Sequence, residues 1–354
     1  MLQMNTHVDI FIIGAGQAGL AAAYHLSKTT INFLLIGQES RIGDPWRQRY
    51  DSLITFTPRA YNALPGLLLE GNPDGCSSKD EIADSLEQYA RHYGFPMQLG
   101  VKVQRLERTA AGFAVTTSQG EIQARQVIVA TGPFQKPHLP PFAQQLSENI
   151  RQMHTSEYVN PSSLQQGNVL IVGAGNSGAQ IAAELSLERE VHLSAGQRLK
   201  FMPLTFWGKS MFWWLNHSGV LRASADSPAG RWLRAKGDPI FGTEVKRALR
   251  SDAVTIKPRT VAAKQDVMLF EDGTQAVYPN IIWATGFRPD YGWIKVPGVL
   301  DGEGRPLHQR GVSSVQGLFF LGLPWQQRRD SALLGGVGRD AEYIVQWIRK
   351  SRRD

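Results

Sequence analysis

The sequence contains very little cysteine. Cys76 is the only one among 354 residues, so the chain can form neither an internal disulfide nor a Cys-x-x-Cys redox pair. A zinc site built on several cysteines is excluded for the same reason. Independence from disulfides is typical of proteins in a reducing compartment, and we therefore expect a cytoplasmic protein.

Long apolar runs are also missing. No stretch of about 18 apolar residues occurs in the sequence, so we expect no helix that spans a membrane. The N-terminus lacks a basic leader followed by an apolar stretch, which predicts that no signal peptide is present. The formal charge of +7 predicts a basic surface. Aromatic and basic residues do not alternate along a recognisable nucleic-acid module, so we expect no nucleic-acid partner.

What the sequence does contain is one large internal repeat. Each copy runs from a short apolar strand through a glycine turn and a helical stretch to a second strand. The first copy starts at Val8 and has its turn at residues 14–19, and the second starts at Val169 and has its turn at residues 173–178. A chain of this length is expected to form two domains, and the repeat predicts one dinucleotide-binding unit in each.

Both turns match the pattern Gly-x-Gly-x-x-Gly. In that pattern the first glycine allows a tight turn, the second lets a pyrophosphate approach the backbone, and the third lets the helix pack on the strand. The helix N-terminus then offers free N–H groups to the phosphates. We expect the cofactor contacts of the two turns to be Gly14, Gly16, Gln17, Ala18 and Gly19 in the first and Gly173, Gly175, Asn176, Ser177 and Gly178 in the second.

Each unit is followed by a strand-rich stretch that ends on Ala-Thr-Gly. The first of these segments is Ala130, Thr131 and Gly132, and the second contains Thr285 and Gly286. Small residues at the end of an apolar strand suit a chain that passes close beside a bound cofactor. A third strand signal at residues 317–322 precedes an apolar helix near residues 341–348. The order of these signals predicts an α/β fold in which one domain is inserted into the other.

These residues resemble a known family. The paired glycine turns, the two Ala-Thr-Gly segments, the stretch from Trp46 to Arg59 and the linker 132–137 look like the flavin-containing monooxygenases, in particular the branch of bacterial members and plant auxin-forming enzymes. The resemblance implies a two-dinucleotide-binding flavoprotein with Rossmann-like domains. FAD would lie in residues 1–160 and 286–354, and NADPH in the inserted residues 161–285.

The resemblance also implies a reaction. In the family, hydride passes from NADPH to FAD, and a flavin C4a-hydroperoxide then delivers one oxygen atom of O2 to a small organic substrate, such as a sulfide, an amine, a ketone or a 2-oxo acid. Gly43, Trp46, Arg47 and Val103 are further cofactor contacts expected on this basis, and Gln326 is a candidate for the flavin edge.

The sequence departs from the family pattern at several positions. The signature between the domains is half matched, because His154 and Tyr158 fit it whereas Glu148 and Ile150 stand where Phe and Gly belong. Phe56 stands where animal members have an asparagine near the flavin. Phenylalanine cannot donate a hydrogen bond, which predicts that hydrogen peroxide leaks when no good substrate is present.

Ribose recognition is the third departure. The end of the second strand usually carries an acid that binds the ribose, but here Gly37 holds that position. Glu39 is the next acid, and it is either the ribose ligand or a solvated loop carboxylate.

The stretch after the matching strand of the second unit contains no acid. A carboxylate there would repel a 2′-phosphate, whereas Arg198 and Lys200 would attract one. These cations predict NADPH, although they could also be ordinary surface cations. Ser194 and Gln197 could hydrogen-bond a bare ribose, so use of NADH stays open.

Residues 206–215 are unusually aromatic. They could pack against the inserted domain, form the wall of a substrate channel, or make a peripheral membrane contact, because Trp and Lys favour the bilayer interface. Sequence alone does not decide among the three.

The leading functional hypothesis is an NADPH-dependent FAD monooxygenase whose partners are a small-molecule substrate and O2. The alternatives are an NAD(P)H-dependent FAD reductase or oxidase, which passes electrons to O2 or a partner protein, and a non-catalytic nucleotide sensor. The sequence is compatible with a homodimer.

Overall fold

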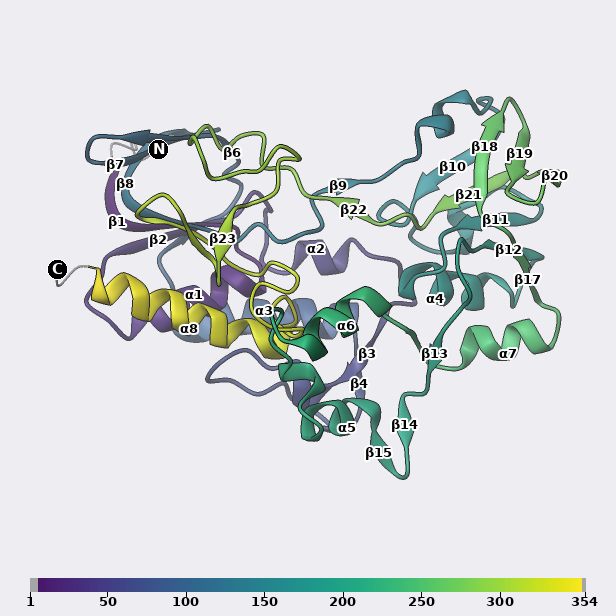
Figure 1. Ribbon diagram of the computed structural model, residues 1–354, viewed down its shortest axis with the longest axis horizontal. Helices are drawn as coiled ribbons and strands as arrows, with labels where there is room; N and C mark the ends of the chain where they lie inside the picture. The colour runs from purple at the N-terminus through teal and green to yellow at the C-terminus, as the bar shows by residue number, and fades with distance from the viewer. Residues whose placement is uncertain (1–5, 352–354) are drawn as a thin grey trace.

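The computed structural model describes residues 6–351. Two α/β domains lie side by side along the long axis of the molecule, and both chain ends emerge from the same domain, at the left of Figure 1. This arrangement confirms the predicted fold class, with one Rossmann-like unit in each domain. No helix in the described part of the chain is long and apolar enough to cross a membrane.

The outer domain is built on a sheet with the strand order β23-β24-β25-β8-β1-β2-β5, to which β6 and β7 are added beside β8. Its strands are β1 (Thr6–Ile13), β2 (Phe33–Ile36), β5 (Met97–Gln98), β6 (Val103–Thr109), β7 (Gly112–Thr117), β8 (Gly120–Val129), β23 (His308–Gln309), β24 (Val312–Ser313) and β25 (Leu318–Phe320). Its helices are α1 (Gln17–Ser27), α2 (Asp44–Arg47), α3 (Lys79–Tyr93) and α8 (Leu334–Lys350), and a separate hairpin pairs β3 (Ile54–Pro58) with β4 (Cys76–Ser78).

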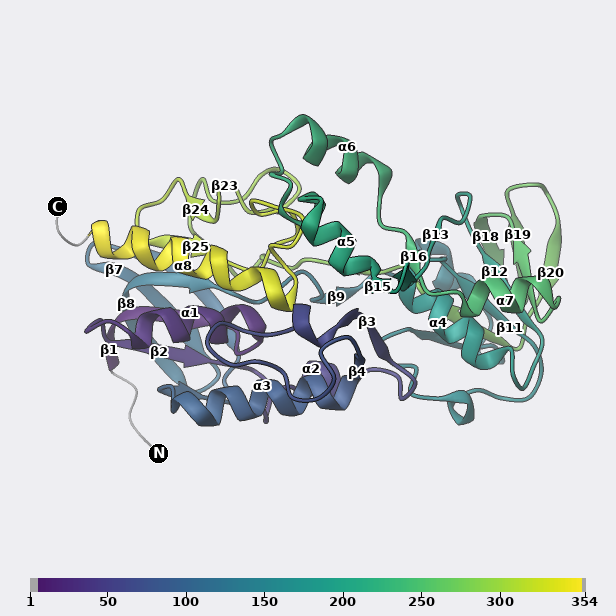
Figure 2. The ribbon, with the colours of Figure 1, turned by 90° about the horizontal axis from the view of Figure 1, so that it is seen from below.

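The core of the outer domain lies on both faces of this sheet. On one face the helices α1 and α8 run side by side, with α3 nearby, as both views show (Figures 1 and 2). On the other face β6 and β7 cover a second apolar cluster, together with residues 291–300. The alanine-rich sequence of α1 buries Ala21, Ala22 and Ala23 completely, because small side chains let helix and sheet approach closely.

The inner domain has a parallel sheet with the order β10-β21-β11-β12-β17. Its elements are β10 (Arg151–His154), β11 (Val169–Val172), α4 (Asn176–Leu185), β12 (Val191–Ser194), α7 (Glu244–Arg250), β17 (Val254–Lys257) and β21 (Asn280–Trp283). A three-stranded antiparallel sheet of β18 (Thr260–Lys264), β19 (Val267–Phe270) and β20 (Gln275–Val277) accompanies it.

The chain crosses between the domains where β9 (Lys136–Pro137) pairs with β22 (Phe287–Arg288). The return crossing lies next to the predicted boundary at residue 286. The other predicted boundary, at residue 160, leaves one strand of the inner sheet in the outer domain. β10 precedes residue 160 and nevertheless pairs with β21 in the inner sheet. Its sequence, Arg-Gln-Met-His, contains no apolar run, so only the pairing partner reveals it as a strand.

A helical insertion leaves the inner domain after β12 and returns before α7. It comprises β13 (Phe201–Met202), β14 (Thr205–Phe206), β15 (Lys209–Ser210), α5 (Met211–His217), α6 (Pro228–Lys236) and β16 (Ile240–Phe241). The insertion reaches the outer domain, because Ala225 N–H donates to the carbonyl of Gln327 and Arg329 binds Asp238 at 3.0 Å. It therefore joins the two domains at a second place, away from the crossing strands.

Candidate active site

The three glycines of the first turn have different surroundings. Gly14 has a φ of +113°, and a Cβ added there would lie 2.5 Å from the carbonyl oxygen of Ala130. A Cβ at Gly19 would collide with the carbonyl oxygen of Gly14. At Gly16, by contrast, a Cβ would meet nothing within 4 Å. Gly14 and Gly19 are therefore fixed by the protein's own backbone, whereas Gly16 borders open space where a ligand can approach.

The second turn repeats this geometry in the inner domain. Gly173 has a φ of +108°, and a Cβ there would collide with the carbonyl oxygen of Ala284. A Cβ at Gly178 would collide with Gly173, and a Cβ at Gly175 would again meet nothing within 4 Å. Ala284 begins the second Ala-Thr-Gly segment, as Ala130 begins the first. In each domain the Ala-Thr-Gly segment thus packs directly beneath its glycine turn.

The helices that follow both turns begin without side-chain caps. Gly16 is the N-cap of α1 and Gly175 is the N-cap of α4, and neither helix start has a capping side chain. The first N–H groups of a helix need partners, and uncapped ones form a ready anion site. Open space beside an uncapped helix N-terminus fits the pyrophosphate of a dinucleotide in both domains.

Several expected contact residues at these turns also have structural tasks. The amide of Gln17 donates to the carbonyl of Ala332 at 2.9 Å, which ties α1 to the loop before α8. Asn176 donates to Pro239 and accepts from Phe241 N–H, which ties α4 to the end of the insertion. Ala18 packs against Gly322.

Glu39 lies close to the first glycine turn. A Cβ at Gly37 would lie 2.8 Å from Ala15 Cβ and 3.1 Å from the Glu39 carboxylate. The Glu39 side chain is half-buried rather than fully solvated. Residues 100–101 run beside this segment, because Gly100 N–H donates to the backbone carbonyl of Glu39 and Val101 N–H donates to that of Gly37, and Val103 follows at the start of β6. This position favours the ribose ligand over a free loop carboxylate.

The other contacts expected in the first domain are occupied within the protein. Arg47 pairs with Asp84 at 2.7 Å and with Glu87 at 3.0 Å, both on α3. Gly43 has a φ of +90° and lies against the backbone of Ala83, and Trp46 packs on the apolar core of the outer domain. These residues hold α2 against α3.

Gln326 and Phe56, the two candidates for the flavin edge, have different neighbours. The Gln326 side chain is buried, accepts from Leu323 N–H at 3.2 Å and donates to the backbone carbonyl of Arg310 at 3.4 Å. Phe56, at the half-buried centre of β3, stacks on Phe241 with ring centres 4.6 Å apart and planes at 9°. Phe212 of the same cluster also stacks on Phe56, with ring centres 6.1 Å apart. Phe56 therefore joins the outer domain to the insertion.

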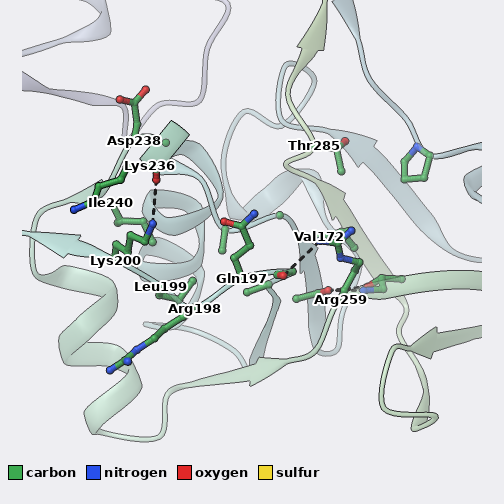
Figure 3. Close-up of a pocket in the computed structure, with 18 of the residues that line it drawn as sticks. Val172, Gln197, Arg198, Leu199, Lys200, Lys236, Asp238, Ile240, Arg259 and Thr285 are labelled. Atoms are coloured by element: carbon green, nitrogen blue, oxygen red, sulfur yellow. Dashed lines mark hydrogen bonds between the residues drawn. The ribbon is translucent and has the colours of Figure 1, made fainter. Parts of the chain in front are cut away.

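A cavity of about 470 Å³ opens beside the second glycine turn. It is lined by the turn, by the segment after β12, by the end of the insertion and by Thr285 (Figure 3). Ser194 lines it as well, but its buried hydroxyl donates to Pro258 at 2.8 Å and accepts from Thr260 at 3.0 Å. Gln197 is exposed at the cavity. Of the two residues expected to meet a bare ribose, Gln197 is the better placed.

The cavity is strongly basic. Its charged lining residues are Arg198, Lys200, Lys236, Arg259 and Asp238, and the single carboxylate, Asp238, pairs with Arg329 at 3.0 Å. Such a lining suits a phosphate better than a bare ribose. The Arg198 side chain extends away from Gln197 and Thr285 in Figure 3, whereas Arg259 reaches Gly196 at 3.5 Å.

Sequence reasoning missed Lys236 and Arg259. Lys236 lies at the end of α6, far along the chain from the glycine turn, and no local pattern marks it. Arg259 follows β17, which pairs with β12 in parallel. Because neighbouring parallel strands end at the same edge of a sheet, a correct assignment of β17 would have placed Arg259 beside residues 194–200.

Two further groups meet at the junction between the domains. His154 Nε2 contacts the Gly286 carbonyl at 2.9 Å, and Nδ1 accepts from Ser156 N–H at 3.1 Å. Burial lowers the pKa of His154, which suits this neutral, structural role.

The Arg49 guanidinium lies 5.4 Å from the ring centre of Phe287, and burial lowers the pKa of Arg49. Among residues 6–351 no carboxylate lies within 4.0 Å of it.

Comparison with known proteins gives one consistent result. Residues 11–199 match the family model described as pyridine nucleotide-disulphide oxidoreductase. The chain is 54% identical over 338 residues to an uncharacterized CzcO-like oxidoreductase of Geobacillus kaustophilus, covering 96% of this chain and 97% of the relative. It is 27% identical to the indole-3-pyruvate monooxygenase YUCCA1 of Oryza sativa subsp. japonica, covering 86% and 81%.

A solved structure is also similar over the whole length. The flavin-containing monooxygenase from Stenotrophomonas maltophilia superposes with a TM-score of 0.80 and 26% identity, covering 98% of this chain and 99% of that one. The similarity extends across both domains, so the two proteins share the same overall fold.

Proposed function

The chain belongs to the pyridine nucleotide-disulphide oxidoreductase family and is an oxidoreductase of the flavin monooxygenase type, and from this we propose that it is an NADPH-dependent FAD monooxygenase acting on a small organic molecule. One observation carries the proposal. Two glycine turns, one in each domain, are open at their second glycine and lead into uncapped helices. Two such sites suit two dinucleotides held by one chain.

The residues of the outer domain fit FAD. The open space at Gly16 and the free N–H groups of α1 would receive the pyrophosphate, and the Glu39 carboxylate would accept hydrogen bonds from the ribose. When bound, FAD accepts hydride from the nicotinamide and reacts with O2, which is chemistry that no side chain supplies. The protein residues set the position of the cofactor and the access of water.

The residues of the inner domain fit NADPH. The turn at Gly175 would hold the pyrophosphate, and the cations of the cavity would hold the 2′-phosphate. Arg259 is the best placed of them, because it borders the cavity and has no carboxylate within 4.0 Å among residues 6–351. A guanidinium can donate two hydrogen bonds to one phosphate. This lining supports NADPH over NADH.

The alternative is a reductase or oxidase that passes electrons to O2 or to a partner protein. The family description mentions a disulphide, but Cys76 is the only cysteine of the chain, so a redox pair of two cysteines within the protein is excluded. The insertion favours the monooxygenase. It covers the loop at residues 327–329 and packs on Phe56, and enclosing the site is what protects an oxygenation from water.

The experiment uses purified holoprotein without oxygen. NADPH is added and the visible absorption of the flavin is followed, after which oxygen is admitted with a sulfide, an amine, a ketone or a 2-oxo acid present. We expect rapid bleaching, followed by oxygen uptake that yields an oxygenated product. An unbleached flavin would indicate a nucleotide sensor. Bleaching followed by one hydrogen peroxide per NADPH with every substrate class would indicate an oxidase or a reductase.

A further inference from the structure

A β-hairpin projects from the insertion and carries aromatic side chains at its tip. β14 and β15 are joined by Trp207 and Gly208, whose φ angles of 47° and 70° give the two-residue turn typical of tight hairpins. In Figure 1 this hairpin reaches the lower edge of the molecule. We call residues 205–210 the aromatic hairpin.

The tip of the aromatic hairpin is exposed and already organised. Trp207 is 81% exposed and Phe206 is 48% exposed. Their rings stack with centres 5.2 Å apart and planes at 11°. Trp214 of α5 lies edge-on to Trp207 at 6.4 Å, and its ring N–H donates to the Phe206 carbonyl at 2.9 Å. The backbone and α5 thus hold two large apolar rings at the surface, where much of their area stays in contact with water.

Packing of the insertion does not account for this tip. The inward part of the same sequence is buried, with Phe212 3% exposed and packed among Leu221, Phe241 and Phe56. Packing therefore explains the inner residues of the aromatic stretch, whereas Phe206 and Trp207 at the tip remain exposed. A second element repeats the pattern. On α6 only Gly230 is buried, and Trp232 is 57% exposed with Lys236 Nζ 3.7 Å from its ring centre.

The surrounding chain is strongly basic. Residues 198–250 contain ten Lys or Arg and three Asp or Glu. Their excess of seven positive charges equals the formal net charge of the whole chain, so the remainder of the sequence is neutral on balance. Part of this charge lines the nucleotide cavity, but Lys209 on the hairpin and Arg231 and Arg234 on α6 are exposed outside it.

Exposed tryptophan beside exposed lysine and arginine is the pattern that favours the interface of an anionic bilayer. We propose that the aromatic hairpin, which carries Lys209, and the exposed Arg231 and Arg234 of α6 form a docking surface for a membrane containing anionic phospholipids. The rings enter the headgroup region and the cations neutralise lipid phosphates. A second copy of this chain fits the surface less well, because it would present the same positive charge.

The test measures binding of the holoprotein to vesicles by co-sedimentation. One set of vesicles contains phosphatidylglycerol and phosphatidylcholine, and the other contains phosphatidylcholine alone. We expect binding to the anionic set only, weakening as salt is raised. Trp207→Ser should weaken it roughly tenfold, and Lys209→Ser about fivefold. Trp347→Ser is the matched control, because Trp347 is also exposed, at 44%, but lies on α8.

Flavin content and NADPH-driven flavin reduction are measured on each variant, and both should stay at the level of the unchanged protein. The proposal is overturned if the unchanged protein ignores anionic vesicles, or if Trp207→Ser and Trp347→Ser behave alike. It is also overturned if Trp207→Ser removes a dimer seen by light scattering and the protein binds no vesicles. Because vesicle binding requires no turnover, these outcomes are distinct from a failure of the proposed oxygenation.

Discussion

At the scale of single residues, substitution of Arg259 tests the nicotinamide site. The sequence predicts Arg198 as the phosphate ligand, whereas the direction of its side chain in the structure favours Arg259. We expect Arg259→Gln to raise KM for NADPH by about 10- to 100-fold, since a charge-assisted contact to phosphate contributes about 1.5–3 kcal/mol.

KM for NADH is the internal control, because NADH has no 2′-phosphate, and Arg198→Ala is the matched control variant. We expect little change in KM for NADH in Arg259→Gln, and little change in KM for NADPH in Arg198→Ala. An equal loss for NADPH and NADH in Arg259→Gln would show that this arginine is structural. A larger effect at Arg198 would restore the role that the sequence predicts.

Arg49 is the second residue with a prediction of its own. It comes from the outer domain, lies against Phe287 just after the second Ala-Thr-Gly segment, and has no carboxylate within 4.0 Å in the described chain. The next residue, Tyr50, hydrogen-bonds Gln180 of α4 at 2.6 Å. Because Tyr50 brings this segment to α4, we expect the Arg49 guanidinium to bind the pyrophosphate of the second dinucleotide.

The measurement compares two ligands by equilibrium titration. Arg49→Gln should raise Kd for NADP⁺ about tenfold and leave Kd for 2′-AMP unchanged, because 2′-AMP carries the 2′-phosphate without the pyrophosphate. Arg49→Lys should recover part of the loss. If NADP⁺ binds Arg49→Gln with unchanged affinity, this arginine has no part in holding the dinucleotide.

At the scale of elements, the two glycine turns allow folding to be separated from ligand binding. Gly14→Val should destabilise the protein strongly, because φ is +113° and the new side chain would press on Ala130. Gly16→Val should fold, since its Cβ meets nothing within 4 Å, but it should be colourless because the side chain fills the pyrophosphate position.

Gly175→Val is the complementary variant in the inner domain. It should be yellow but should not be bleached by NADPH, because only the second dinucleotide site is blocked. Absorption spectra and thermal unfolding report both properties. A yellow Gly16→Val with full flavin content would refute the assignment of the first turn.

The same scale shows what could be predicted from the sequence. The glycine turns and the strands before them were recognisable because each residue depends on its immediate neighbours: Gly14 needs a positive φ, and Val169 to Val172 form a fully buried strand. β10 was missed because a strand of polar residues is identified only by its partner β21. Lys236 was missed because only the folded insertion brings it to the cavity, and Arg259 was missed because β17 was not assigned as the neighbour of β12.

At the scale of the whole molecule, the insertion adds a second connection between the two domains. The crossing strands β9 and β22 join them at one side, and the aromatic cluster around Phe56 joins them at another, together with the contacts of Ala225 and Arg329. For the proposed reaction, a segment that encloses the flavin would exclude water. How well oxygen transfer is coupled to NADPH should therefore depend on this second connection.

Phe56→Ala tests that dependence. Loss of its stacking on Phe241 and Phe212 should lower the free energy of unfolding by about 1–3 kcal/mol and raise the hydrogen peroxide released per NADPH consumed, while NADPH still reduces the flavin at the original rate. Phe56→Leu, which keeps an apolar side chain, should show a smaller rise in peroxide.

Phe56→Asn separates two explanations for peroxide release. If Phe56 acts by packing, asparagine opens the aromatic cluster and peroxide rises, as in Phe56→Ala. If the missing hydrogen-bond donor at this position limits coupling, as the family resemblance implies, asparagine supplies the donor and peroxide falls. The stacking geometry leads us to expect the rise, and a fall in a variant with full flavin content would return Phe56 to the edge of the flavin.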